Sequence, residues 1–500
     1  MGFDASVISG VVKFVELDFS LNKLQLGWAV SSLTLTSTLA MLIAGPLSDR
    51  FGRRLILRIA AILYAVSAVG SALAPDFTIL VIARMIGGLG VGASLITAPM
   101  YIAEISPAKV RGTMVSFNQL NIVLGISVAF FTNYLILRLG DNPSQWVSYL
   151  GIDENNWRWM LGLETLPAVM YFIFLVAVPE SPRWLAMRGR EKEALGILER
   201  VTDSEQAQNV LTSIKENLES EKNQKSVPLK DLFKPALRLV LVIGIVVAIT
   251  QQITGINAVF FYAPMIFEQT GIGTDASFSQ AILVGLTNLV FTVLAMWLID
   301  RLGRKSLLAI GLSGIVLFMG LLSFGFSRAT YNLDSNDVEI LKEQIDSPYW
   351  YKIQDINYDS DLGFKKAVSR NLGEDVLVKY QSDLIGRAIH INPWIILIGI
   401  LGFVASFAIS IGPVMWVLFS ELFPNWIRAV AISFVGFINS GVSFLVQLVF
   451  PWELSNFGNS VTFLIFAVFG IMGLIFIMST LHETKGKTLE ELEVILAKKK

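Results

Sequence analysis

The chain has 500 residues, of which 54% are hydrophobic and only 16% are charged, well below the charged share of about 25% in soluble domains. A net charge of −1 argues against nucleic acid as a partner, and the absence of cysteine excludes disulfides, thiolate metal sites and cysteine nucleophiles. With two histidines and neither a nucleophile–base arrangement nor a metal motif in the sequence, we expect a membrane protein that is not an enzyme and has no cofactor.

The first element is a short apolar segment, residues 1–16, which opens MGFDASVISG and places an acid, Asp4, close to the first methionine. It shows no positively charged leader, no apolar run of signal-peptide length and no small-residue cleavage site. Apolar stretches of about 20 residues, enough to cross a bilayer as a helix, then recur along the chain. We expect eleven such spans, at residues 24–47, 54–74, 78–102, 114–138, 157–178, 237–262, 275–299, 305–326, 394–419, 426–450 and 460–481.

Two polar stretches, 179–236 and 327–392, interrupt the series of spans. The first contains REKEALGILERV and EQAQNVLTSIKENLESE, whose charged amphipathic pattern predicts helices, and a similar helix is expected in the tail segment KTLEELEVIL. The second contains DSPYWYKIQDINYDSD, with aromatic residues among acids. A lid, a partner surface and a folded spacer are all compatible with it, and we favour a loop without a direct part in the chemistry of the protein.

Basic residues fix the orientation of the spans, because loops rich in lysine and arginine stay in the cytoplasm. One set of loops has only Lys23, whereas the alternate set has Arg50, Arg53, Arg54, Arg58, Lys109, Arg111, Arg301, Arg304, Lys305 and Arg428. The second set is therefore cytoplasmic, and so are 179–236 and the tail, 482–500. We expect a multi-pass protein of the cell (inner) membrane, with a cytoplasmic C-terminus and with 327–392 outside.

An internal repeat shows how the spans are grouped. DRFGRR at 49–54 returns as DRLGRK at 300–305, and EISPAKVR at 104–111 returns as ELFPNWIR at 421–428. The two offsets, 251 and 317 residues, differ by 66 residues, which is the length of the second polar stretch. The second half of the chain is therefore a copy of the first, with an outside segment inserted.

The repeat gives two like-oriented halves, 1–178 and 237–481, joined by the polar linker. Six spans in each half require a span before residue 17, so residues 1–16 are interpreted as the remnant of a first helix. We accordingly expect Met1 to be an internal methionine, with an apolar segment upstream in the gene. Two like-oriented halves are typical of transporters, whose site lies near the midplane between the halves.

Nine short motifs stand in order along the chain: DRFGRR, RMIGGLGVG, PMYIAEISPAKVRG, FNQL, PESPRWL, QQITGINAVFFYAP, DRLGRK, GPVMWVLFSELFP and HETKG. Together they resemble the signature set of the sugar porter family of the major facilitator superfamily, outside 327–392. The chain looks most similar to the bacterial xylose–proton and galactose–proton symporters of that family. The resemblance implies an all-α membrane protein with the major facilitator fold, two six-helix halves (the first helix truncated here) and a cytoplasmic helical linker.

Charge inside the fourth span, 78–102, points to a buried pair. Arg84, Gly88 and Gly92 are four residues apart and share one helix face, on which the glycines allow another helix to approach closely. A guanidinium inside a span is costly and usually has a partner acid. The resemblance pairs Arg84 with Asp4, and it makes Asp4 the candidate proton site.

A sugar site is expected where amides and aromatic rings meet inside the membrane, because amides both donate and accept hydrogen bonds. Gly255 would allow the local unwinding that brings Gln252 and Asn257 together. An isolated amide in a span is more often a hydrogen-bonding group between helices. The resemblance implies a site made of Gln119, Gln251, Gln252, Asn257, Tyr262, Asn288, Trp416 and Asn439. Asn439 is followed by Ser440, where the family often has an aromatic residue.

Acids and arginines recur in pairs at the cytoplasmic helix ends of both halves. They are Asp49, Arg53, Glu104, Arg111, Asp300, Arg304, Glu421 and Arg428. Basic loops alone would fix the topology, but topology does not require acids at matching positions in both halves. The resemblance implies a network that bridges the halves when the inner side is closed, and exposed pairs worth at most about 1 kcal/mol each suit a latch that opens repeatedly.

The leading hypothesis is a secondary active transporter of a monosaccharide, a pentose or a hexose, by sugar–proton symport through alternating access, acting as a monomer in the lipid bilayer. Facilitators of the family have a neutral residue at the position of Asp4, so an acid there favours coupling. A facilitative sugar uniporter, in which Asp4 is structural, is the alternative. A non-transporting sugar sensor is less favoured, because the tail after residue 482 is short for a signalling domain.

Overall fold

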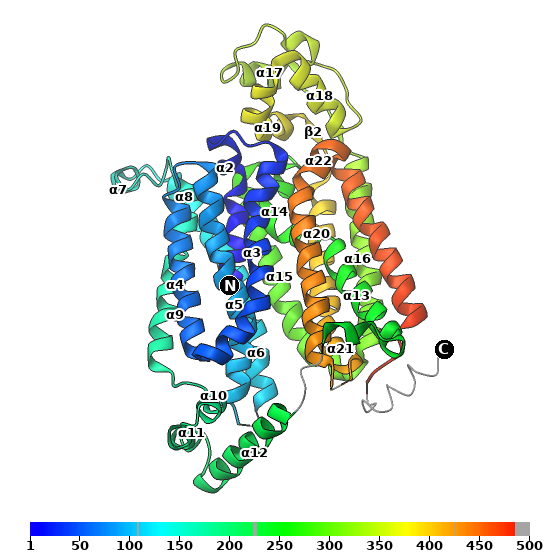
Figure 1. The fold of residues 1–500 in the computed structure, drawn as a ribbon. Coiled ribbons are helices and arrows are strands. Elements are labelled where there is room, and N and C mark those ends of the chain that lie inside the picture. Colours follow the sequence, from blue (N-terminus) through cyan, green and yellow to red (C-terminus); the bar gives the residue numbers. More distant parts are fainter. Residues whose placement is uncertain (108–109, 224–227, 425, 486–500) are drawn as a thin grey trace.

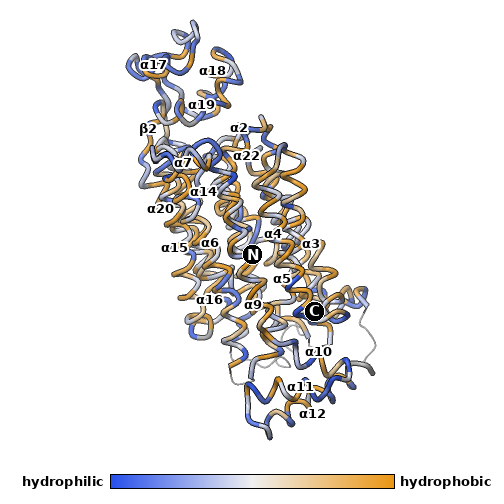
Figure 2. Tube along the Cα trace, turned by 90° about the vertical axis from the view of Figure 1, so that its left-hand side faces the viewer, coloured by the Kyte–Doolittle hydropathy of each residue, from blue (hydrophilic) through white to orange (hydrophobic). Residues whose placement is uncertain are grey.

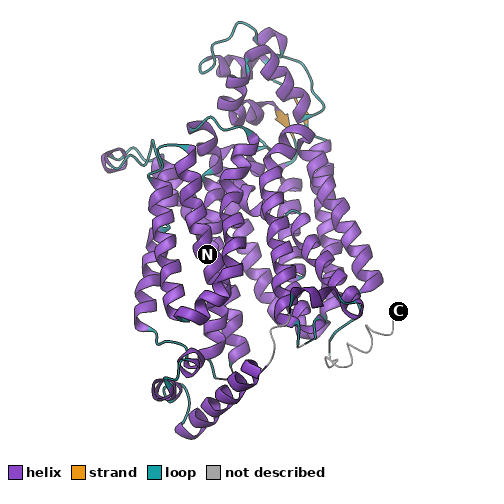
Figure 3. Ribbon diagram, in the orientation of Figure 1, coloured by secondary structure: helices purple, strands orange, loops and turns teal. Residues whose placement is uncertain are grey.

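The computed structural model describes residues 1–107, 110–223, 228–424 and 426–485. The chain is almost entirely helical, and its long helices stand side by side in two bundles, one from each half of the chain (Figures 1 and 3). A polar unit lies at each end of the bundles, with α17–α19 at one end and α10–α12 at the other (Figure 1). Figure 2 shows that hydrophobic residues are concentrated in the long helices between these ends.

The first bundle begins with a short broken helix and continues with long helices. Its elements are α1 (Gly2–Val7), η1 (Ile8–Gly10), α2 (Val12–Asp18), α3 (Lys23–Phe51), α4 (Arg53–Ala72), α5 (Phe77–Ile105), α6 (Arg111–Gly140), α7 (Gln145–Tyr149), α8 (Asn156–Gly162) and α9 (Thr165–Ala177). Asn22 and Gln25 form a capping box that fixes the start of α3. Asp76 accepts a hydrogen bond from the amide of Ile79 and so fixes the start of α5.

The second bundle repeats this arrangement with two broken helices. Its elements are η3 (Pro235–Leu237), α13 (Arg238–Ile253), α14 (Ile256–Glu268), α15 (Gly273–Leu302), α16 (Arg304–Ser327), α20 (Pro393–Ile409), α21 (Ile411–Leu422) and α22 (Arg428–Thr480). Gly458 has φ 78° and ψ 168°, so the 53 residues of α22 turn back there and form two crossings. Ten helices of the described chain are long and apolar enough to cross a membrane. With α22 counted as two, the eleven predicted spans and the all-α membrane fold are confirmed.

Matching glycine turns show the repeat in three dimensions. Gly52 separates α3 from α4 with φ 102°, and Gly303 separates α15 from α16 with φ 87°. These left-handed conformations favour glycine. Near each turn a glutamate from the end of the same half accepts a hydrogen bond from a backbone amide just after the glycine. Glu180 accepts from the amide of Arg54 at 3.1 Å, and Glu483 accepts from the amide of Arg304 at 2.8 Å.

The linker between the halves is helical, as its amphipathic pattern predicts. It consists of α10 (Pro182–Met187), α11 (Glu191–Leu198), α12 (Ser204–Asn223) and η2 (Leu229–Phe233). Leu185, Leu198 and Leu211 are buried together where α10, α11 and α12 meet. The helix expected in the tail, KTLEELEVIL, lies outside the described residues.

The polar segment 327–392, called the outer unit after its predicted location, is a folded unit with its own core, and the expectation of a loop is wrong. It contains β1 (Thr330–Tyr331), α17 (Ser335–Lys342), η4 (Trp350–Lys352), α18 (Asp361–Leu372), α19 (Glu374–Ala388) and β2 (Ile389–His390). The two strands pair antiparallel at the base of the unit, with Thr330 opposite His390. Trp350 and Phe364 are buried in its core, and burial of such large rings supplies the stabilisation that a loop lacks.

Candidate functional site

The centre of the second bundle is organised by a break between α13 and α14. Gly255 adopts φ 93° and ψ 14°, which ends α13 after Ile253 and starts α14 at Ile256. A Cβ atom at Gly255 would lie 2.6 Å from the ring of Phe466, so both the backbone and the packing require glycine here. The unwinding predicted at this glycine is confirmed.

The break brings amides from both half-helices into contact. Asn257 donates from Nδ2 to Oε1 of Gln252 at 2.8 Å. Gln252 donates from Nε2 to Oδ1 of Asn439 and to Oε1 of Gln251, both at 3.1 Å. Four of the eight predicted sugar-site residues therefore form one hydrogen-bonded cluster, the amide cluster, between α13, α14 and α22.

Gln251 ties the amide cluster to a second broken helix. Its Nε2 donates to the carbonyls of Ile411 and Gly412, each at 3.1 Å, at the start of α21. Ser410, between α20 and α21, has φ −127° and ψ −104°, so this helix is also interrupted. Carbonyls freed by broken helices are typical of sites near the midplane of a transporter.

A polar ladder, which the sequence analysis missed, continues from the amide cluster along α22. Asn257 donates to Oγ of Ser443 at 2.6 Å, and Gln447 donates to the same oxygen at 2.8 Å. Thr34 of the first half then donates to Oε1 of Gln447 at 2.9 Å. The signal was present, because Asn439, Ser443 and Gln447 are spaced four residues apart and share one face of the helix.

The other predicted sugar-site residues lie around this cluster without joining it. The hydroxyl of Tyr262, at a kink in α14, donates to the carbonyl of Gln447 at 2.9 Å. Asn288 is buried in α15, whereas Gln119 on α6 is exposed. Trp416 on α21 is 47% exposed and packs edge-on against Phe419. Among the described residues, neither Gln119 nor Asn288 makes a hydrogen bond with the amide cluster.

The buried charges of the first bundle lie close together without forming the expected direct pair. Asp4 and Arg84 are only 1% and 2% exposed, but no ion pair joins them within the described chain. Arg84 donates from Nε to the carbonyl of Ala29 at 3.2 Å. Both carboxylate oxygens of Asp4 are buried without a hydrogen-bond partner among the described residues.

Glu164 is a further buried acid that the sequence analysis missed. It is 4% exposed, and it lines the same cavity as Asp4, with Tyr64 and Ser94 among the other lining residues. An acid in the predicted span 157–178 was itself a signal, because ionisable residues inside the membrane are costly and usually functional. Asp4 and Glu164 thus lie in one cavity, close to a buried arginine.

The glycines that follow Arg84 allow close packing, as predicted. A Cβ atom at Gly88 would lie 2.1 Å from Oγ1 of Thr36, and one at Gly92 would lie 2.2 Å from the carbonyl of Ser37. α3 therefore lies directly against α5 along this face. This contact holds Ala29, and with it the acceptor of Arg84, in place.

The charged residues predicted to lie at the cytoplasmic helix ends form two separate clusters. Arg53 pairs with Asp49 and Glu104, each at 2.9 Å. In the other half, Arg304 pairs with Glu421 at 2.7 Å. Of the remaining predicted members, Arg428 donates to the carbonyl of Phe423, Arg111 is exposed, and the side chain of Asp300 lies outside the described residues.

Ion pairs between the halves lie at the opposite end of the bundles. Lys13 of α2 pairs with Glu268 of α14 at 3.1 Å, and Arg138 of α6 pairs with Asp275 of α15 at 2.9 Å. At the inner end, no ion pair or hydrogen bond between the two bundles occurs within the described ranges. Within the described chain, the two bundles are therefore joined by ion pairs at one end only.

The comparisons with known proteins agree with this geometry. The model of the family "Sugar (and other) transporter" matches residues 1–337 and 382–496, so the unmatched segment falls inside the outer unit. An arabinose-proton symporter of Bacillus subtilis is 36% identical over 497 residues, covering 99% of this chain and 92% of the relative. A D-xylose-proton symporter of Escherichia coli is 34% identical over 527 residues, with the same coverage of each chain.

Solved structures show the same likeness in three dimensions. The inward open conformation of the xylose transporter XylE from E. coli matches with a TM-score of 0.74 and 31% identity, over 99% of this chain and 96% of that one. A partially occluded inward open conformation of the same transporter matches with a TM-score of 0.71. Since the family match extends over most of the sequence, the chain belongs to the sugar (and other) transporter family, with the fold of the sugar porters of the major facilitator superfamily.

Proposed function

We propose that this protein is a secondary active transporter that carries a monosaccharide, a pentose or a hexose, together with a proton by alternating access. The observation that supports this proposal best is the amide cluster, in which Gln251, Gln252, Asn257 and Asn439 meet where α13 breaks. Amides present both donors and acceptors without net charge, as the hydroxyl groups of a neutral sugar require. The arabinose and xylose specificity of the relatives supports a pentose as the first candidate.

Sugar binding would exchange hydrogen bonds rather than create them. In the structure the amides satisfy one another, for example Asn257 with Gln252 at 2.8 Å. A sugar hydroxyl can replace such a bond with one donated and one accepted, so neither state leaves a buried polar group unpaired. Trp416 is 47% exposed, and its ring offers an apolar face for the C–H surface of the sugar.

Asp4 is the proposed proton-coupling residue, with Arg84 and Glu164 as its electrostatic neighbours. All three are buried within the membrane-spanning part, where ionisable groups mark proton relays. Asp4 has no ion pair with Arg84 among the described residues, which fits an inward-open state that would release a proton to the inside. We infer that the two approach each other when the outer side opens.

The charge clusters at the inner end would serve as the inner gate. Arg53 with Glu104 and Arg304 with Glu421 each stay within one half in the structure. Closing the inner side would bring the two clusters together, so that arginines of one half could pair with acids of the other. The positive loops at this end support a cytoplasmic location for it and for the C-terminus, and we propose that the protein is a monomer in the cell membrane.

The test is uptake of radiolabelled arabinose, xylose and glucose into proteoliposomes, with and without an inward proton gradient. Symport predicts accumulation only with the gradient, and an Asp4→Asn variant that retains counterflow but loses accumulation. Equilibration that ignores the gradient would instead indicate a uniporter. Sugar binding without counterflow would indicate a sensor and contradict transport.

A further inference from the structure

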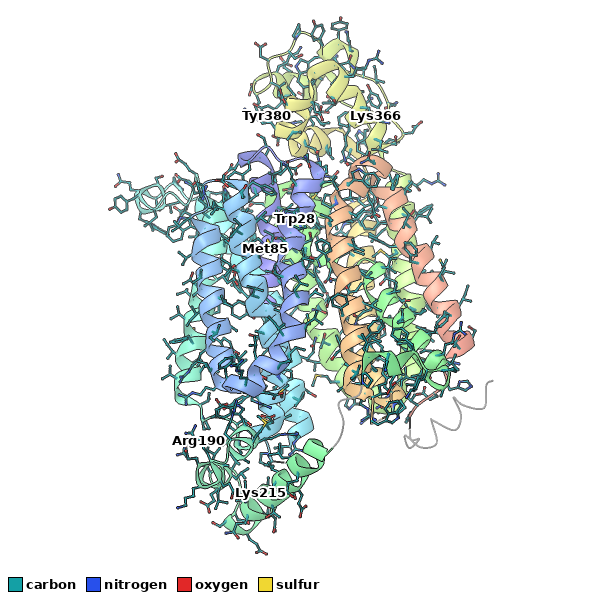
Figure 4. All side chains as sticks on the ribbon, in the orientation of Figure 1. Trp28, Met85, Arg190, Lys215, Lys366 and Tyr380 are labelled. Atoms are coloured by element: carbon teal, nitrogen blue, oxygen red, sulfur yellow. The ribbon has the colours of Figure 1, made fainter. Side chains whose placement is uncertain are left out.

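A positively charged cavity lies at the inner end of the first bundle, between α4, the end of α9 and the linker helices. Its volume is about 550 Å³, and its walls include Arg54 and Arg58 of α4, Glu180 after α9, and Arg190, Glu193 and Arg200 of the linker. Figure 4 shows Arg190 at the junction between the long helices and the linker. The cavity is remote from the amide cluster, and the proposed transport steps make no use of it.

The charges in the cavity do not cancel. Glu193 forms an ion pair with Arg190 at 2.6 Å. Glu180 is occupied by backbone amides, since it accepts from the amide of Arg54 at 3.1 Å and from that of Ser181 at 2.9 Å. Within the described chain, the guanidinium groups of Arg58 and Arg200 form no ion pair. The arginines lining the cavity outnumber its two glutamates, so it carries a surplus of positive charge that an anion would balance.

Two of these guanidinium groups are held in fixed positions. Arg54 donates from Nε to the carbonyl of Leu175 at 3.2 Å and from Nη2 to that of Val176 at 2.8 Å. Arg58 donates to the same two carbonyls, at 3.1 and 3.4 Å. The carbonyls belong to the C-terminal end of α9, which cations stabilise. The Nη1 groups of both arginines make no hydrogen bond within the described residues, so they can bind an anion without rearrangement.

The cavity opens beside the lipid-facing surface of the bundle. Leu55 and Ile59 of α4 are 44% and 42% exposed, and Phe174 and Val176 of α9 are 63% and 53% exposed. These apolar side chains belong to membrane-spanning helices, so lipid chains cover them. A phospholipid fits such a place, because its phosphate can bind in the cation-lined cavity while its acyl chains pack against the adjoining apolar surface.

The internal repeat shows that this feature is specific to one half. Arg54 and Arg58 correspond to Lys305 and Ala309 at the offset of 251 residues, so the second half retains one of the two cations. Lys305 donates to the carbonyl of Met478 at 3.1 Å. Topology requires positive charge in both halves, and it does not explain the second arginine in the first half.

We propose that this cavity binds the phosphate of an anionic phospholipid of the inner leaflet, with its acyl chains against Leu55, Ile59 and Val176. Guanidinium groups bind phosphate oxygens through paired, charge-assisted hydrogen bonds, and basic pockets at the cytoplasmic membrane surface bind anionic headgroups. Because Arg190 and Arg200 come from the linker, the bound lipid would also join the linker to the first bundle.

The test is native mass spectrometry of delipidated protein titrated with phosphatidylglycerol or phosphatidylcholine. We expect preferential binding of phosphatidylglycerol, which the double variant Arg58→Gln, Arg200→Gln weakens by roughly 30-fold, about fivefold for each cation. The matched control, Lys192→Gln with Lys215→Gln, removes the same charge from α11 and α12 outside the cavity, with Lys215 farther from the long helices (Figure 4). It should bind phosphatidylglycerol as the wild type does.

A third variant moves the affinity in the opposite direction. Glu193→Gln removes an acid from the cavity and frees Arg190, so binding of phosphatidylglycerol should become tighter, and this variant does not depend on the folding of the double variant. Equal binding of the two lipids, or equal weakening in the lysine control, would overturn the proposal. Displacement of the lipid by millimolar inorganic phosphate would assign the cavity to a soluble anion and overturn the lipid assignment.

Discussion

Gln252 and Asn257 belong to different half-helices, α13 and α14, and their side chains are joined by a hydrogen bond of 2.8 Å. On an uninterrupted helix the two side chains would point about 140° apart. The left-handed turn at Gly255 is what brings them together. The site therefore depends on a backbone conformation that one residue makes possible.

Gly255→Ala should disrupt the amide cluster. Alanine is strained at φ 93°, by about 1 to 2 kcal/mol, and its Cβ would lie 2.6 Å from Phe466. We expect a lower thermal midpoint and a loss of sugar binding, measured by isothermal titration. Gly273→Ala is the matched control, because its φ of 78° imposes similar strain while no atom lies within 4 Å of the added Cβ. An equal loss of binding in the control would show that strain alone is responsible.

Gln252→Ala should weaken sugar binding without unfolding the protein. The substitution removes one hydrogen bond from each of Asn257 and Asn439, and each lost hydrogen bond is worth about 1 kcal/mol. We therefore expect the dissociation constant to rise by roughly 10-fold or more, with little change in the thermal midpoint. Gln344→Ala, at an exposed position in the outer unit, should leave binding unchanged. Wild-type affinity in Gln252→Ala would exclude this residue from the sugar site.

Glu483→Gln should loosen the start of α16 in a pH-dependent way. Burial raises the pKa of the Glu483 carboxyl, but hydrogen bonds from the amides of Lys485, Arg304 and neighbouring residues outweigh it, so the pKa lies below its usual value. The ionised carboxylate thus stabilises the folded state above about pH 4.5, and this contribution is lost as the pH falls through the lowered pKa.

The measurement for Glu483 is hydrogen exchange of the amides of Arg304 and Lys305, which both donate to this carboxylate. Exchange in the variant should be faster than in the wild type at neutral pH, and the difference should vanish in acid. Glu339→Gln, at an exposed position on α17, serves as the control. A difference that persists unchanged at low pH would contradict the electrostatic explanation.

Asp361→Asn should detach the outer unit from the helices beneath it. Asp361 is 8% exposed, accepts from Nδ2 of Asn459 at 3.2 Å and pairs with Lys365 at 3.4 Å. Burial lowers the pKa of the Lys365 ammonium, which the Asp361 carboxylate raises in turn, so the substitution leaves a partly buried cation without its counter-ion. Limited proteolysis within residues 327–392 should become faster by several-fold. Asp375→Asn, which is exposed, should behave like the wild type.

The sequence predicted the membrane fold well because its signals do not depend on tertiary contacts. Span length is set by bilayer thickness, and orientation is set by the basic loops, so both are readable from single segments. The unwinding at Gly255 was also predictable, because glycine between clustered amides has few other roles. Ser443 and Gln447 were missed because single polar residues in a span more often join helices than form a site.

Features that depend on the conformational state or on packing were less predictable. Asp4 and Arg84 were expected to pair, and in the structure both are buried with no ion pair between them among the described residues. The outer unit was expected to be a loop, and it instead contains short helices, such as α17 with eight residues. Its stability comes from side chains far apart in the chain, such as Trp350 and Phe364, which periodicity does not reveal.

The polar ladder along α22 links the amide cluster to a contact between the two halves, since Gln447 receives a hydrogen bond from Thr34. One chain of hydrogen-bonded side chains therefore connects the amide cluster to the contact through which the outer side would close. The two equilibria are then coupled reciprocally. The factor by which a bound sugar changes the equilibrium constant for closure equals the factor by which closure changes the affinity for the sugar. If a bound sugar favours closure, the closed state therefore holds the sugar more tightly than the open one by the same factor.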